Sequence, residues 1–346
     1  MSRRKEVDQT KIGYQMSVVA WLKAHAPEAV TVAIVALAIV LIELRRAPIH
    51  FSPAARERTT AQRAAYPRVM HDSSGATLVI ESRPQRIVSQ TLGSDEVLFG
   101  VCAADQVVGV SERALDEQYS NVADRVRKLS LPQIKNVEDV VELRPDIVFV
   151  ASYSSAEQVE LLRSTGTTVF RLSNFDQIDG IMSNIRAIGY AVGEDRCADD
   201  LVAQMKSRLQ EIASATAHRS APRVMEYSTS GYTSGAHTLT DEMFRVVGAR
   251  NLAAEHGVKG DISVSAEVVA LWQPDFIVAG APHGESDQVL HALMANPAIA
   301  NSPAGRSGQI IVIDDRFLLC VSQYIVPAIE QLADGLYGRT KAQSSL

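Results

Sequence analysis

Apolar and polar positions alternate in blocks along the chain from residue 84 onward. Short runs rich in β-branched residues predict strands at 86–89, 107–110, 147–150 and 168–170. Apolar positions at helical spacing predict helices between them at 95–102, 137–143 and 156–164. Uninterrupted apolar strands separated by helices are typical of a parallel sheet that is covered on both faces.

The pattern restarts after Pro222. It predicts strands at 223–227, 276–279 and 310–313 and helices at 241–247, 267–271, 289–294 and 322–337. Before it, isoleucines at 178, 181, 185 and 188 form one helix face. Residues 195–217 contain no Gly or Pro and predict one helix of roughly 30 Å at ~1.5 Å per residue. A chain of 346 residues exceeds what one core usually supports, so two lobes, 84–194 and 218–346, are expected on either side of this helix.

The two halves share a local motif. Glu138 and Glu267 each precede a Pro-Asp pair by seven residues, with an apolar helix before the pair and a strand after it. A second echo joins Asp95-Glu96 to Asp241-Glu242, since each pair follows a strand that begins with Arg and an apolar residue. The repeat predicts two lobes of similar construction.

An apolar segment lies near the N-terminus, at residues 29–44. It is apolar except for Thr31 and Glu43, and as a helix of 16 residues it would cover roughly 24 Å, slightly less than the ~30 Å hydrocarbon core. We interpret it as a transmembrane signal-anchor; an export-signal core is the other interpretation by length, and a buried core helix fits less well.

The flanks of this segment indicate its orientation. Arg45 and Arg46 follow it directly, which argues against signal-peptidase cleavage, and basic residues within 1–23 favour an N-terminus inside the cell. We therefore expect a cytoplasmic segment at 1–28 and a proline-containing tether at 45–83. The remaining chain is expected on the periplasmic, extracytoplasmic face of the cytoplasmic membrane.

Composition excludes some classes of function. A net charge of −6 argues against a nucleic-acid partner, which would require a basic surface. Cys102, Cys197 and Cys320 form no C-x-x-C motif and are interpreted as small core residues, with one disulfide left open. No G-x-S-x-G elbow, Walker A loop or G-x-G-x-x-G fingerprint is present, so no catalytic residue is assigned.

The order and spacing of several short motifs along about 250 residues resemble the cobalamin and iron-siderophore class of periplasmic binding proteins of ABC importers. The motifs lie at 86–89, 95–99, 107–110, 138–146, 232–235, 251–254 and 265–275. The resemblance implies an α/β fold of two Rossmann-like lobes joined by a single long bridging helix, with ligand in the cleft between them. It also implies that Glu138 and Glu267 dock onto arginines of the permease dimer. The alternative is that each Glu only favours its helix N-terminus, worth ~0.3–1 kcal/mol.

Loops at the carboxyl ends of the predicted parallel strands are where a ligand would bind. Aromatic side chains there could stack on a macrocycle, and arginines could pair with an anionic chelate. The candidate ligand-binding residues are Thr91, Arg113, Tyr153, Tyr227, Tyr232, His283, Arg316 and Phe317. A bare metal ion is disfavoured because residues 83–190 contain no histidine, and no resident cofactor is predicted.

The sequence therefore predicts a solute-binding subunit of an ABC importer. It would capture a metal chelate, such as an iron-siderophore, cobalamin or a haem-like molecule, and deliver it to a permease dimer with its ATPase. Two alternatives stay open at this point. One is a membrane-tethered ligand sensor, and the other is an α/β enzyme whose site is built by loops.

Overall fold

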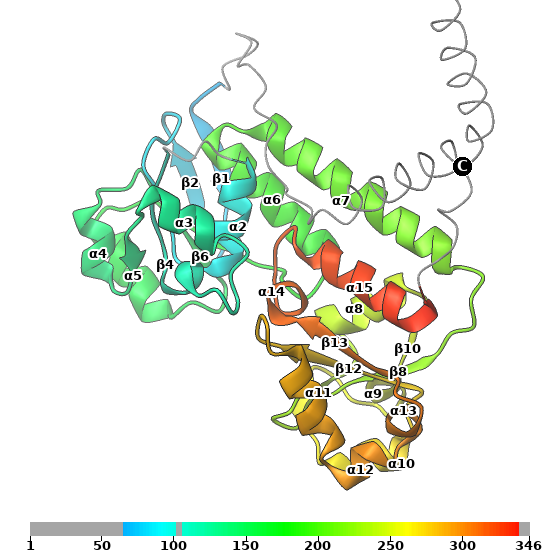
Figure 1. Cartoon of the computed structure of the whole chain (residues 1–346). Coiled ribbons are helices and arrows are strands. Elements are labelled where there is room, and N and C mark those ends of the chain that lie inside the picture. The colour runs from blue at the N-terminus through cyan, green and yellow to red at the C-terminus, as the bar shows by residue number, and fades with distance from the viewer. Residues whose placement is uncertain (1–64, 102–105, 339–346) are drawn as a thin grey trace, which may run out of the picture. The chain divides into compact units, whose positions relative to one another are not determined.

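The computed structural model describes residues 65–101 and 106–338, and within them two parallel sheets lie in separate lobes (Figure 1). The first has the order β5-β4-β3-β6-β7, with bounds β3 Ile87–Ser89, β4 Val107–Ser111, β5 Gln133–Ile134, β6 Ile147–Ala151 and β7 Val169–Leu172. The second has the order β10-β8-β12-β13, with bounds β8 Arg223–Glu226, β10 Arg250–Asn251, β12 Phe276–Ala281 and β13 Ile310–Asp314. All neighbouring strands in both sheets are parallel, as predicted.

Helices follow the strands in each lobe. In the first lobe they are α2 Leu92–Val101, the 3-10 turn η2 Glu112–Leu115, α3 Ala123–Leu129, α4 Val137–Glu142, α5 Ala156–Ser164 and α6 Ile178–Val192. In the second lobe they are α8 Leu239–Val246, α9 Leu252–Glu255, α10 Ala266–Trp272, α11 Ser286–Met294, α12 Pro297–Ala300, α13 Pro303–Arg306, α14 Asp315–Leu318 and α15 Ile325–Tyr337. A small antiparallel pair, β9 Tyr232–Ser234 and β11 Asp261–Ser263, completes the second lobe.

The predicted bridging helix is α7, Asp195–Thr216. Its 22 residues span roughly 33 Å at ~1.5 Å per residue. It packs on α2 and α6 of the first lobe and on α8 and α15 of the second (Figure 1). The fold is therefore the predicted one, two α/β lobes joined by one long helix.

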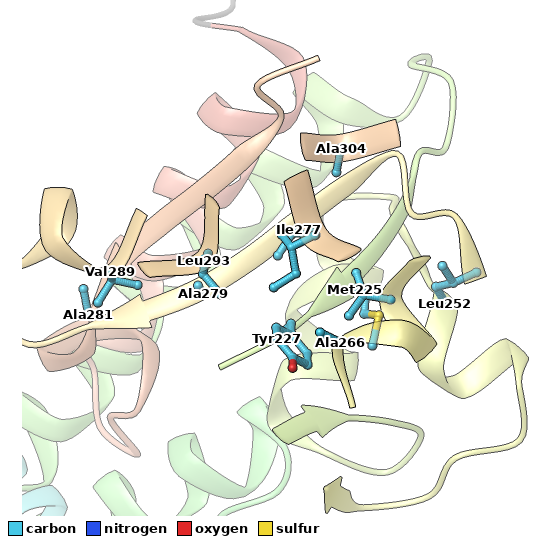
Figure 2. Packing of buried hydrophobic residues seen from close by; sticks show 12 residues of the cluster. Met225, Tyr227, Leu252, Ala266, Ile277, Ala279, Ala281, Val289, Leu293 and Ala304 are labelled. Atoms are coloured by element: carbon cyan, nitrogen blue, oxygen red, sulfur yellow. The ribbon is translucent and has the colours of Figure 1, made fainter. Parts of the chain in front are cut away.

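Each sheet is buried because its strands are apolar on both faces. All five residues of β6 are buried, and in the register of β3 on β6 Ile87 lies opposite Ile147. The second lobe repeats this with Met225 of β8 opposite Ile277 of β12 (Figure 2). Figure 2 also shows α10 contributing Ala266 to the same core.

The Pro-Asp motif has the same structural role in both lobes. Asp146 Oδ2 accepts a hydrogen bond of 2.9 Å from the backbone N–H of Arg86, at the start of β3. Asp275 Oδ2 accepts one of 2.9 Å from the N–H of Arg223, at the start of β8. Each aspartate lies just before a strand, β6 or β12, and holds the start of the adjacent strand, β3 or β8. The Pro-Asp motif thus has the same role in both lobes.

The segment expected to be a tether differs from expectation near its end. Arg68–His71 (β1) and Thr77–Ile80 (β2) form an antiparallel hairpin with alternating burial. Arg68 Nη2 lies 2.9 Å from Asp195 Oδ2 at the start of α7, so the hairpin is held to the folded part. The period-2 alternation around the turn at 72–75 is the sequence signal for it.

The predicted cytoplasmic segment 1–28, the anchor 29–44 and the first part of the tether lie outside the described residues. No helix in the part of the chain that is described is both long and apolar enough to span a membrane. Cys320 is buried and Cys197 is partly exposed, both as free thiols, and Cys102 is also outside the described residues.

Gly180 of α6 packs closely against the backbone of the preceding loop, and substitution at this position tests that packing. A Cβ at this position would lie 2.0 Å from the backbone oxygen of Asn174, which cannot move aside as a side chain could. We expect Gly180→Ala to lower the free energy of unfolding by about 1–3 kcal/mol, measured by urea denaturation. Ser183→Ala, at an exposed position of the same helix, should change it by less than about 0.5 kcal/mol. Equal stability of the two variants would contradict this packing.

Candidate ligand cleft

A cavity of about 380 Å³ lies between the two lobes. Its first-lobe wall comes from the start of α2, from η2 and the loop after it, and from the end of β6. Its second-lobe wall comes from α14 and the segment after it. The lining residues are Leu92, Gly93, Glu96, Arg113, Tyr119, Tyr153, Asp315, Leu319, Cys320 and Val321. These positions follow the carboxyl ends of β3, β4, β6 and β13, where ligands bind in open parallel sheets.

The lobes touch directly at the floor of this cavity. A Cβ on Gly93 would lie 2.6 Å from Cγ2 of Val321, so any larger residue here would have to displace the Val321 side chain. One turn further along α2, Glu96 is fully buried, and its carboxylate accepts hydrogen bonds from the Ser322 hydroxyl and, at 2.8 Å, from Asn121 Nδ2. Gly93 and Glu96 of α2 therefore pack against the chain that follows α14.

Burial controls the acidity of the two carboxyl groups at this helix. Burial raises the pKa of Glu96 to about 7, although hydrogen bonds from Ser322 and Asn121 oppose the rise. Burial also raises the pKa of Asp95 to about 8, against hydrogen bonds from Ser111 and Ser89. Asp95 ties α2 to the end of β4, because its carboxylate accepts from the Ser111 N–H at 3.2 Å.

The second echo also has a matching structural role. Asp241 Oδ1 accepts from Asn251 Nδ2 at 3.0 Å, and so ties α8 to the end of β10 as Asp95 ties α2 to β4. Glu242 Oε2 accepts from the Ile178 N–H at 2.6 Å, which reaches the first lobe from the second. Glu96 of the first lobe makes the corresponding contact with the second lobe, because its carboxylate accepts a hydrogen bond from the Ser322 hydroxyl.

A second cavity between the lobes has a volume of about 250 Å³. It is lined by Asn174, Asp176, Gln177, His237, Thr238, Glu242 and Arg245.

Two of the expected ligand residues line the main cavity. Tyr153 is 65% exposed and its ring lies 5.4 Å from that of Phe175. Arg113 also lines it, with its guanidinium 5.5 Å from the Tyr119 ring. Thr91 is next to this wall but buried, and its hydroxyl is hydrogen-bonded to that of Ser94 at 2.6 Å, so it orders the start of α2.

The other expected residues lie elsewhere. Tyr227, the residue after β8, is a core residue, 6% exposed and packed in one cluster with Met225 and Ala266 (Figure 2). Tyr232 is exposed on β9 and does not line this cavity. His283 Nδ1 lies 2.6 Å from Asp314 Oδ2.

Arg316 also pairs with Asp314, with Nη2 2.8 Å from Oδ2. Its guanidinium lies 5.6 Å from the ring of Phe317 on the same helix turn, and both side chains are partly buried. Neither residue lines the main cavity. Arg316 was expected to pair with an anionic chelate. In the structure its guanidinium is already paired with Asp314 of the same lobe.

Sequence reasoning missed most of the second-lobe wall. Leu319, Cys320 and Val321 line the cavity from an irregular segment between α14 and α15, next to the predicted closing helix. Their signal was the apolar run 317–321, which begins three residues after the end of β13. Tyr119 was missed because it lies in the loop between η2 and α3, eight residues beyond the end of β4.

Glu138 and Glu267 are both exposed and occupy the first turns of α4 and α10. Each helix leads back into a parallel strand, so its N-terminus lies toward the carboxyl edge of its sheet, the side on which the cleft opens. A hydrogen bond from the Ser265 hydroxyl lowers the pKa of Glu267 below its ordinary value. Their docking role stays a prediction.

Two α/β lobes, one long connecting helix and a cavity walled by both lobes define a two-lobed binding protein. Residues 87–317 match the family described as periplasmic binding protein, and the chain belongs to that family. It is 28% identical over 323 residues to a cobalamin-binding protein of Halobacterium salinarum, covering 91% of this chain and 86% of that one.

Two further relatives support this placement. An uncharacterized ABC transporter substrate-binding lipoprotein of Bacillus subtilis is 26% identical over 285 residues, covering 80% of this chain and 87% of that one. The apo structure of a periplasmic haem-binding protein from Roseiflexus sp. RS-1 superposes with a TM-score of 0.64 at 25% identity, covering 73% of this chain and 98% of that one. The relatives are thus ligand-binding proteins, and one is named as a transporter component.

Proposed function

We propose that this chain is the solute-binding subunit of an ABC importer and captures a metal chelate in the cavity between its lobes. The observation that carries the proposal is the cavity of about 380 Å³, whose walls come from both lobes. Exposed aromatic and apolar side chains at its mouth, Tyr153 and Leu319, suit a planar or macrocyclic ligand. A relative named for cobalamin and a structural neighbour named for haem fit the same class of ligand.

The chain would act from the outer face of the cytoplasmic membrane, held there by residues 29–44. The apolar character of this segment and the Arg45-Arg46 pair after it support an uncleaved anchor. The partners would be a permease dimer with its ATPase, and the protein would bind its ligand without chemical change. Mass spectrometry of the membrane form tests the anchor, since a mature N-terminus beyond Leu44 would contradict it.

Ligand binding tests the proposed function directly. A ligand that binds only the folded state adds about 2.7 kcal/mol to the free energy of unfolding when it is present at 100 times its Kd. We expect cyanocobalamin, haemin or a ferric siderophore to raise the thermal midpoint of the full chain in detergent. If no chelate of the three classes raises the midpoint, the proposal is contradicted.

Tyr153 and Tyr232 form a matched pair for locating the site. Both are exposed tyrosines, at 65% and 51%, but Tyr153 lines the cavity and Tyr232 does not. We expect Tyr153→Ala to raise the Kd of the bound chelate by about tenfold or more, because it removes a stacking surface. Tyr232→Ala should change the Kd by less than about threefold. Calorimetric titration gives both values, and the reverse order would move the site toward β9.

A further inference from the structure

The charges around the main cavity indicate what kind of chelate it accepts, given the proposed function. Its apolar part is formed by Leu92, Leu319, Val321 and the rings of Tyr119 and Tyr153, which would face the ring system of a ligand. These apolar contacts would be similar for different macrocycles, so they do not determine which macrocycle binds more tightly. The polar groups of the wall have to do so, because a buried polar group left without a partner is costly.

The positive charges near the cavity already have negative partners. Among the described lining residues, Arg113 is the one that carries a positive charge, and its Nη1 lies 4.0 Å from Asp116 Oδ2. Arg316, on the second lobe, is held by Asp314 through contacts of 2.8–3.1 Å. A carboxylate-rimmed ligand would therefore have to compete with these aspartates for its cations.

Acidic side chains line the cavity from both lobes. Glu96 lines it from the first lobe and Asp315 from the second, where no basic side chain lines it among the described residues. Asp315 also interacts electrostatically with Glu226, whose pKa rises to about 7 through burial and, in part, through the charges of Asp261 and Asp315. The pKa of Asp315 rises to about 6 through burial and the charge of Asp314, so it is ionised at neutral pH. The second-lobe wall thus presents hydrogen-bond acceptors and a negative potential.

We propose that this cavity selects a metal chelate whose rim carries amide N–H donors and no net negative charge, as a corrinoid does, and disfavours carboxylate-rimmed chelates such as haem. Asp315 accepts hydrogen bonds from rim amides, and a charged acceptor makes such a bond about twice as strong as a neutral one. The same carboxylate repels a ligand carboxylate, because both carry a negative charge. Selection thus combines an attractive and a repulsive element at one residue.

A matched set of ligands tests this selection. The full chain in detergent is titrated by calorimetry at pH 7.5 with cyanocobalamin, with cobinamide, with the corrin heptacarboxylic acid that has the same ring but carboxylates in place of amides, and with haemin. Protein-free micelles serve as the blank for each ligand. We expect both amide-rimmed corrinoids to bind at least tenfold more tightly than the heptacarboxylic acid and haemin.

Variants then assign the selection to one residue. Asp315→Asn should reduce the preference for amide-rimmed over carboxylate-rimmed corrin by fivefold or more. Asp287→Asn, at an exposed aspartate in the first turn of α11, should leave it unchanged. An unchanged preference in Asp315→Asn would overturn the role of Asp315.

The outcomes separate this inference from the proposed function. Haemin or the heptacarboxylic acid binding as tightly as the amide-rimmed corrinoids would overturn the selection and leave chelate capture standing. Failure of every chelate to bind, ferric siderophores included, would overturn chelate capture itself and the selection with it.

Discussion

Reversing the charge of both Glu138 and Glu267 is expected to abolish uptake while ligand binding stays intact. The two glutamates are exposed, begin equivalent helices of the two lobes, and lie toward the carboxyl edges of their sheets. A permease dimer that docks on both lobes would place one cationic site against each. Close charge pairs at protein interfaces have measured coupling energies of ~1.5–7 kcal/mol, so two repulsive contacts should lower uptake by at least about a hundredfold.

The measurement is uptake of the bound chelate by cells that express the importer, together with pull-down of the permease. Each single Glu→Ala variant should weaken both less than the double Glu→Arg variant, and high salt should reduce the differences. The matched control is Glu157→Arg with Asp287→Arg, since these acidic residues occupy the first turns of the next helices, α5 and α11. Normal uptake in the Glu138/Glu267 double variant would contradict docking, and loss of ligand affinity would place the pair in the cleft.

The fold could be predicted from the sequence because most strands of the two sheets are marked by their own apolar residues; the two-residue edge strands β5 and β10 were not predicted. β6 is an unbroken apolar run and β12 repeats it after the same Pro-Asp motif, so the positions of these strands follow from local patterns. The long helix α7 could be placed because Gly and Pro are absent from it. The hairpin β1–β2 was missed because two four-residue strands next to prolines look like a linker.

The cavity could be predicted only in part because it depends on contacts between distant segments. Arg113 and Tyr153 were found since they directly follow strands of the first lobe. Tyr227 was expected in the cleft but lies in the core of the second lobe. The apolar pattern of a short strand does not show toward which side of the sheet such a ring points. The approach of Gly93 to Val321 joins residues more than 200 positions apart, and no local pattern reports it.

The free energy of unfolding is expected to decrease as pH rises, which is the second large effect. Two buried carboxyl groups of α2, Asp95 and Glu96, cause it. The pKa of Glu96 rises from 4.5 to about 7 on folding and that of Asp95 from 3.8 to about 8, in both cases because burial disfavours the charged form. Between about pH 5 and 8 the folded state therefore binds more protons than the unfolded state. By linkage, the free energy of unfolding must then fall as pH rises through this window. For Glu96 alone the change corresponds to roughly 3 kcal/mol.

Urea denaturation of the full chain at pH 5, 6, 7 and 8 measures this slope. Aspartates whose pKa is lowered, such as Asp275 and Asp314, act below this window and do not offset it. We expect Glu96→Gln to remove up to about 1.4 kcal/mol per pH unit from the slope, since it removes one titrating group. Glu138→Gln, at an exposed position, should keep the profile of the unmodified chain. Stability that rises from pH 5 to 8, or a Glu96→Gln profile as steep as that of the unmodified chain, would show that hydrogen bonds from Ser322 and Asn121 keep Glu96 ionised in spite of its burial.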